Sequence, residues 1–182
     1  MRPAFIAFIF IVFAFTARSQ NEFAAGYYLN AKNDTIKGEV KLFTKNEMDY
    51  YVKMFFRPLN IHTGGGKQML PAKIHGYGVE DRHYASVKLL EMWVFMQVIC
   101  TGKVTLFEYK PPVAMGNEKM ESQYYVVRAG EEMEQIFISS KVRKQIRPYI
   151  SDDKELMKEI EGQEMHYAEL VDVITRYNER NQ

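Results

Sequence analysis

The sequence contains a single cysteine, and this excludes an internal disulfide. A chain of this length buries enough surface to fold without covalent cross-links, so a hydrophobic core must stabilise it. The apolar run from Val98 to Cys100 favours a buried core cysteine. A reactive thiolate would need an electropositive and partly exposed setting instead.

The sequence also lacks an excess of charge of one sign and a hydrophobic run long enough to cross a bilayer. It has 24 Lys and Arg against 23 Asp and Glu, which excludes a polybasic nucleic-acid-binding chain. The longest apolar run, Ala4 to Phe15, has 12 residues, whereas a transmembrane helix needs about 20. With 47% hydrophobic residues, the composition fits a soluble globular domain and excludes a disordered chain.

The chain begins with the three parts of a secretory signal peptide. Met1 to Pro3 is a short basic start, Ala4 to Phe15 is the apolar run, and Ala17 to Ser19 is a small-x-small cleavage site. We therefore expect residues 1–19 to be cleaved and the protein to be exported, to the periplasm or the cell surface. The mature chain, residues 20–182, then has a formal charge of −1 and no transmembrane segment.

Residues 20–138 show the short alternating patterns of β-strands. Residues 35–42 alternate after the turn formers Asn33 and Asp34, which predicts a hairpin with residues 26–29. The continuous apolar run 93–100 is consistent with either a short helix or a buried strand. Further strands are predicted at residues 50–56, 74–79, 84–90, 104–109, 124–128 and 133–138. We expect about seven to nine short antiparallel strands in a curved sheet or partial barrel.

From residue 139 to residue 182 the hydrophobic period becomes that of helices. Val142, Ile146 and Ile150 recur every four residues, after a candidate N-cap at Ser139 or Ser140. Such a helix must cover its apolar stripe with another apolar surface.

Two more helices are predicted, one from Ser151–Asp153 to a stop at Gly162 and one over residues 165–177. Pro148 is expected to shorten or kink the last turn of the first helix. The fold class is therefore a single α+β domain, in which C-terminal helices cover an antiparallel, β-rich N-terminal part.

The sequence shows no constellation that assigns a catalytic residue, a metal ligand or a cofactor. Gly64 to Lys67 resembles a phosphate-binding loop, but Ile61 and Gln68 replace the required glycine and hydroxyl residues, so a flexible connection is favoured. The chain has no GxSxG or HExxH motif. A non-catalytic role is favoured on these grounds.

One region leaves chemistry open. His75 and His83 flank Glu80 and Asp81 across a predicted turn, which permits a metal site or an acid/base cluster. The simpler interpretation is that both are half-exposed histidines of a sheet.

Three tyrosine pairs are the candidate binding residues. A strand sends adjacent side chains to opposite faces, so one ring of each pair is expected to be exposed and free to contact a sugar or a protein. Structural tyrosines of a sheet are the alternative, since tyrosine has a high strand propensity. The six residues are Tyr27, Tyr28, Tyr50, Tyr51, Tyr124 and Tyr125.

A basic cluster occupies the first C-terminal helix. Lys141, Arg143, Lys144 and Arg147 alternate with its apolar positions, which is typical of a solvated helix face and leaves contact with an anionic lipid or polyanion as the alternative. Six acidic residues follow between 152 and 164 and are expected to cancel the long-range field. We therefore expect no nucleic-acid partner.

Several short segments, in their order along the chain, resemble those of uncharacterised exported proteins common in Bacteroidota. They follow a signal peptide that ends in Ser–Gln, and comprise Gly26–Tyr28 with Asp34–Gly38, Pro71–Gly78, Gly102–Leu106 and a C-terminal helix that ends in Tyr177–Asn178. The resemblance implies a protein of the cell envelope in a bacterium with an outer membrane. It implies no catalytic residues.

Three functional hypotheses follow. The first is a non-catalytic exported domain that binds a protein or glycan partner in the envelope. The second is a carrier that holds a small apolar ligand between a curved sheet and the helices. The third is a hydrolase that uses carboxylates or the His75 and His83 region. The sequence leaves the partner and the oligomeric state open.

Overall fold

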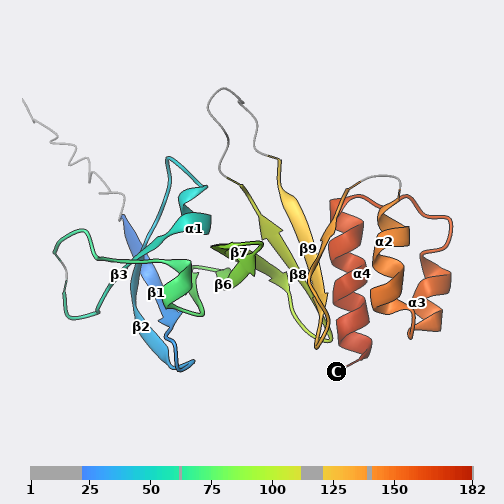
Figure 1. Ribbon diagram of the computed structural model, residues 1–182, viewed down its shortest axis with the longest axis horizontal. Helices are drawn as coiled ribbons and strands as arrows, with labels where there is room; N and C mark the ends of the chain where they lie inside the picture. The colour runs from blue at the N-terminus through green and yellow to red at the C-terminus, as the bar shows by residue number, and fades with distance from the viewer. Residues whose placement is uncertain (1–21, 62, 112–120, 139–140, 182) are drawn as a thin grey trace, which may run out of the picture.

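The computed structural model describes residues 22–61, 63–111, 121–138 and 141–181. The predicted signal peptide, His62 and the candidate caps Ser139 and Ser140 lie outside these ranges. Within them the chain forms one antiparallel sheet of ten strands and four α-helices, three of them C-terminal (Figure 1). The predicted α+β class is confirmed, with strands mainly N-terminal. No helix in the described ranges is both long and apolar enough to cross a membrane.

The sheet is open and its strands lie in the order β10-β9-β8-β7-β6-β5-β1-β2-β3-β4. Most neighbours in this order are also neighbours in sequence and are joined by hairpins. The strands are β1 (Phe23–Leu29), β2 (Thr35–Lys41), β3 (Met54–Arg57), β4 (Lys67–Met69), β5 (Gly76–Val79), β6 (Arg82–Leu89), β7 (Met92–Cys100), β8 (Val104–Tyr109), β9 (Gln123–Arg128) and β10 (Glu134–Ile136).

The three C-terminal helices follow the predicted periods, whereas the short helix α1 was not predicted. The helices are α1 (Asp49–Val52), α2 (Val142–Ile150), α3 (Lys154–Glu159) and α4 (Tyr167–Arg180), with a 3₁₀ turn η1 at Pro71–Lys73. Asp153 caps α3 by accepting a hydrogen bond from the backbone N–H of Leu156. Gly162 follows with φ +79°, the left-handed conformation that ends a helix. Pro148 lies within α2 near its end.

One predicted strand is wrong in its first half. Residues 50–56 were expected to be extended, but Tyr50 and Tyr51 lie in the single turn of α1 and only residues 54–57 form β3. The side chains explain the difference: on a helical turn both rings enter the core, whereas a strand would send one of them away from it. The ambiguous run 93–100 is a strand, β7.

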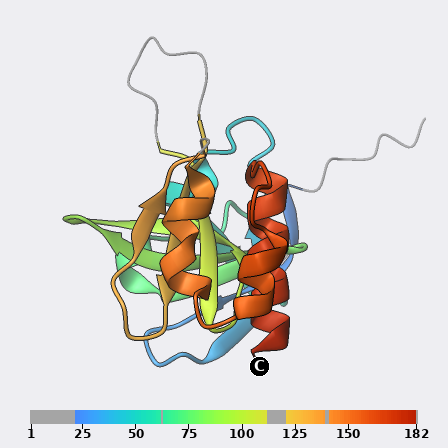
Figure 2. The same cartoon turned by 90° about the vertical axis from the view of Figure 1, so that its right-hand side faces the viewer.

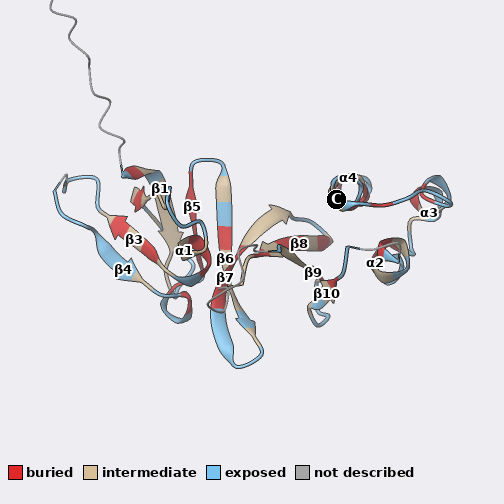
Figure 3. Ribbon diagram, turned by 90° about the horizontal axis from the view of Figure 1, so that it is seen from above, coloured by how far each residue is buried: buried red, intermediate tan, exposed pale blue. Residues whose placement is uncertain are grey.

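The two faces of the sheet cover two separate hydrophobic cores. Seen from above, the sheet curves strongly, and the C-terminal helices lie against its β7–β10 end (Figure 3). Alternate residues of β8 enter different cores: Leu106 packs against the helices, while Phe107 packs against the aromatic residues of the first seven strands. A bulge in β7 between Val98 and Cys100 shifts the register, so that Val98 packs in the aromatic core and Cys100 in the helical one.

Candidate functional site

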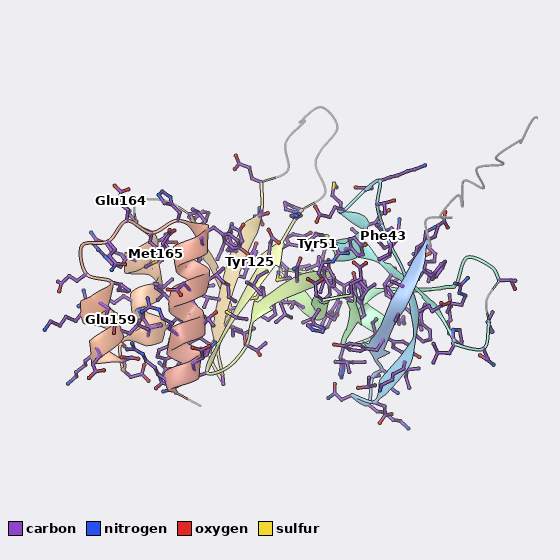
Figure 4. The ribbon with its side chains drawn as sticks, turned by 180° about the vertical axis from the view of Figure 1, so that it is seen from behind. Phe43, Tyr51, Tyr125, Glu159, Glu164 and Met165 are labelled. Atoms are coloured by element: carbon purple, nitrogen blue, oxygen red, sulfur yellow. The ribbon has the colours of Figure 1, made fainter. Side chains whose placement is uncertain are left out.

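Three of the six candidate tyrosines are not available for surface contacts. Tyr50, Tyr51 and Tyr125 are buried, with 2%, 0% and 6% of their surface exposed. The expectation of one exposed ring per pair is therefore wrong for the Tyr50–Tyr51 pair. Figure 4 shows Tyr51 and Tyr125 in the interior beside the sheet. Desolvation raises the pKa of the Tyr51 hydroxyl above its ordinary range, so it stays protonated.

The other three candidates are half-buried and engaged with neighbouring side chains. The Tyr27 hydroxyl is hydrogen-bonded to Nδ1 of His83 at 3.0 Å. The Tyr28 ring packs edge-on against Phe56, with centroids 4.8 Å apart. Tyr124 stacks on Tyr167 of α4 at 4.6 Å. Tyr27 and Tyr28 point to opposite faces of β1, and Tyr124 lies on β9, so the three rings do not form one aromatic patch.

The side chains of His75 and His83 do not meet in one site. His83 is bonded to Tyr27, whereas His75 is hydrogen-bonded to the side chain of Asn33. Glu80 forms an ion pair with Arg82 at 3.1 Å. Within the described ranges no group of three or more metal-ligating side chains comes together, so Asp81 and its neighbours do not assemble the metal site that their spacing permitted.

The space between the sheet and the C-terminal helices, where a carrier would hold its ligand, is filled by buried, mainly aliphatic side chains. The other face of the sheet is covered by aromatic rings. Tyr84 stacks between Tyr50 and Tyr77, with centroids 5.6 and 4.7 Å away. Arg82 covers the Tyr50 ring, its guanidinium carbon 4.5 Å from the centroid. Both faces of the sheet are thus covered by packed side chains, and the carrier hypothesis stays a prediction.

A cationic groove lies between α2 and α3. Figure 2 shows the C-terminal helices, which face the viewer at this end of the molecule. Its volume is about 420 Å³. One methionine and one serine contribute the uncharged part of the wall, and five basic side chains face one carboxylate. The lining residues are Arg143, Lys144, Arg147, Ser151, Lys154, Met157, Lys158 and Glu161.

The helical period places these cations together. On α2 the buried positions Val142, Ile146 and Ile150 point to the core, so the residues between them face outwards. On α3, Lys154 and Lys158 are four residues apart and share one face. Each helix therefore presents cations spaced about 6 Å along its axis.

The acidic residues of the same segment do not neutralise the groove. Asp152 is bound by Lys103 of the β7–β8 turn, Arg128 of β9 and Tyr177 of α4. The Lys103 ammonium and the other two donors lower the pKa of Asp152 well below its usual range.

Glu159 pairs with Arg176 at 2.6 Å and Arg180 at 2.8 Å, both on α4. These carboxylates therefore pair with cations outside the groove, and Glu161 is the acidic side chain that lines it. The cancellation of the long-range field stays a prediction. The acids of α3 face α4, while its lysines face α2.

Four of the groove cations form no ion pair with a described residue. Lys144, Arg147, Lys154 and Lys158 are exposed, and none of them forms an ion pair with a residue of the described ranges. Arg143 differs, because it donates to the carbonyls of Ile160 and Gln163 and so joins α2 to the end of α3. The hydrogen bonds of Arg143 thus hold the two helices of the groove together, and the other four cations are accessible to a negatively charged ligand.

The sequence interpretation identified half of this groove. The α2 cluster was recognised, but Lys154 and Lys158 were overlooked because six acids surround them. Their spacing of four residues was the available signal.

Cys100, expected in the core, is half-buried, and burial raises the pKa of its thiol, which favours the unreactive protonated form.

Comparison of the chain with models of protein families, with curated proteins and with solved structures gives no match.

Proposed function

We propose that this protein is an exported binding domain that holds an anionic glycan of the cell envelope in the groove between α2 and α3. The observation that carries the proposal is a set of four cations on the two walls of one concave surface, none of which forms an ion pair with a described residue: Lys144, Arg147, Lys154 and Lys158. Like charges held together repel each other in the free protein, and a bound polyanion relieves this repulsion.

The shape of the site favours a chain-like ligand over a lipid surface. A bilayer is flat and is best contacted by a convex or planar cationic face, whereas these cations line a hollow. A linear polymer with a negative group on successive sugars can lie along the groove and neutralise cations on both walls. Ser151 and Met157 offer a hydroxyl and an apolar contact to the uncharged parts of a sugar.

The compartment is part of the proposal and has separate support. The signal-peptide pattern of residues 1–19 and the resemblance to exported proteins of Bacteroidota both favour the periplasm or the cell surface. Anionic glycans are accessible there. The hypothesis of a partner bound through tyrosines is weaker, because three of the six rings are buried.

The test is a binding titration with defined polymers at several salt concentrations. The mature chain is titrated with heparin as a sulfated glycan, with polygalacturonate as a carboxylated glycan, and with the uncharged polymer dextran. We expect binding to one or both charged glycans, with an affinity that falls as salt rises, and no binding to dextran.

The matched variants remove two charges from different places. Lys154→Ala/Lys158→Ala is expected to weaken binding roughly tenfold, the scale of losing two exposed charge contacts. Lys32→Ala/Lys37→Ala removes two exposed lysines of the β1–β2 hairpin and should leave affinity unchanged. Equal losses in both double variants would show attraction to net charge alone and would contradict a built site. Tighter binding to phosphatidylglycerol vesicles or to duplex DNA than to either glycan would also reject it.

A further inference from the structure

The turn between β6 and β7 presents the two most exposed large apolar side chains of the described ranges. Leu90 is 86% exposed and Met92 64% exposed, and the neighbouring Trp93 is 49% exposed. Figures 2 and 3 show this hairpin projecting from the rest of the molecule. A group of exposed apolar side chains on a projecting element is typical of a contact with another molecule.

Leu90, at the tip of the hairpin, has a backbone conformation that is unfavourable for leucine. Leu89 pairs with Met92, so Leu90 and Glu91 form a two-residue turn. Leu90 has φ +54°, a left-handed conformation that glycine and asparagine adopt more readily than leucine. Since leucine favours neither this turn nor solvation, its side chain is explained by an intermolecular contact.

The outer part of the hairpin is also free of other strands. Among the described strands, β5 pairs with β6 only as far as Ala85, and β8 pairs with β7 only from Gln97 onwards. Between these points β6 and β7 pair with each other alone. The tip is therefore accessible from several sides.

The same chain carries a hollow of complementary chemistry. It has a volume of about 380 Å³ and lies between the end of β1, β4 and η1. Its apolar lining is Tyr28, Met69, Leu70 and Ile74. Two exposed lysines, Lys67 and Lys73, also line it, and neither forms an ion pair with a described residue.

The charge at the tip selects the partner. Glu91 lies between Leu90 and Met92, its side chain is 96% exposed, and its one ion pair, with Lys88, is long at 3.9 Å. A carboxylate at this position opposes insertion into a bilayer. It suits an apolar hollow that also holds two lysines. We infer that the β6–β7 tip of one copy docks into the hollow of a second copy.

The position of the hollow permits a reciprocal exchange. The Ser86 hydroxyl of β6 donates to the carbonyl of Pro71, which follows Leu70 directly, so the hollow adjoins the base of the hairpin. Four residues from Ser86 to Leu90 span about 13 Å of strand. Two copies related by a two-fold axis can then each place a tip in the other's hollow, which gives a closed dimer.

The first test follows mass and fluorescence together. Sedimentation velocity over a concentration series should show a monomer–dimer equilibrium. Trp93 is the only tryptophan, so its emission should shift to shorter wavelength as the dimer forms. Leu90→Asn suits the left-handed turn and removes the apolar tip. We expect it to weaken dimerisation at least tenfold while the melting temperature stays the same or rises.

A charge exchange tests the pairing itself. Glu91→Lys and Lys73→Glu should each weaken the dimer, and the double variant should restore it. Glu131→Lys in the β9–β10 turn and Lys154→Glu on α3, both at the helical end of the molecule, serve as controls. The inference is overturned by a wild-type chain that stays monomeric at all soluble concentrations, by a dimer that Leu90→Asn leaves intact, or by a double variant without recovery. A Trp93 shift that needs phosphatidylglycerol vesicles instead of a second copy also overturns it.

Discussion

The side chain of Asn178 in α4 forms two hydrogen bonds with the backbone of Val104 in β8. Its amide oxygen accepts from the Val104 N–H at 2.9 Å, and its amide nitrogen donates to the Val104 carbonyl at 2.7 Å. Asn178 is 5% exposed, so this contact is shielded from water. It provides the pair of bonds that a neighbouring strand would make. Helix α4 is thereby fixed to the start of β8.

Removal of this contact should destabilise the fold. Asn178→Ala leaves the buried N–H and C=O of Val104 without partners, and we expect a loss of about 2–4 kcal/mol in the free energy of unfolding. Gly102→Ala should act on the same contact, because a Cβ there would lie 2.4 Å from Cγ of Asn178. Urea denaturation measures both, with the exposed neighbour Glu179→Ala as the control. A loss below about 0.5 kcal/mol for Asn178→Ala would show that water replaces the amide.

The Asp152 network predicts a pH-dependent contribution to stability. Lys103, Arg128 and Tyr177 bind the Asp152 carboxylate and lower its pKa. The unfolded chain then binds a proton more readily than the folded one, so this stability is fully present above the ordinary Asp pKa of about 3.9. It is lost as pH falls through the lower folded value.

Asp152→Asn should therefore cost about 1 kcal/mol at pH 7, a figure reduced for the exposure of the carboxylate. The difference from the wild type should shrink as the pH falls below about 4. Thermal unfolding at pH 7, 5, 4 and 3 measures it. A difference that stays constant over this range would assign the effect of Asp152→Asn to packing.

Gln145 protects one edge of the sheet. Its side-chain amide bonds to both the N–H and the C=O of Phe137, at 2.9 Å each, directly after the edge strand β10. Gln145→Ala exposes these groups beside Phe137, which is 61% exposed. We expect faster aggregation on mild heating, measured by light scattering, with little change in secondary structure. Lys144→Ala on the same helix is the control, and equal aggregation of the two variants would contradict an edge-protecting role.

The single carboxylate of the cationic groove should weaken ligand binding. Glu161 lines the groove opposite five basic side chains, so Glu161→Gln raises its positive charge without a large change in shape. We expect roughly threefold tighter binding of the charged glycan identified above, which corresponds to under 1 kcal/mol for an exposed charge. Glu164→Gln, on the loop after α3, should have no such effect. Weaker binding of Glu161→Gln would show that this carboxylate contacts the ligand as an acceptor.

Several segments recognised in the sequence have structural roles. Gly78 pairs with Tyr27 across the β1–β5 ladder, and a Cβ on Gly78 would lie 2.4 Å from the Tyr27 ring. Gly102 and Asn178 meet in the contact described above. These residues are far apart in the chain, so their pairing could not be derived from spacing.

The candidate groove, too, was predicted only in part from the sequence. The alternation of charged and apolar positions on α2 predicted which side chains face solvent. It did not predict that Glu159 would pair with Arg176 and Arg180 of α4 and so leave Lys154 and Lys158 facing α2. Such a choice depends on which helix lies beside which.

Local pattern alone determined most of the strands, the three C-terminal helices and the α+β class, because the period of buried side chains is a property of neighbouring residues. Tertiary structure decided the rest. It turned Tyr50 and Tyr51 into a helical turn, since both rings gain burial there, and it divided the core between two faces of one curved sheet. It also decided that Glu159 pairs with α4 while the lysines of α3 line a groove with α2, because ion pairs form between side chains that folding brings together.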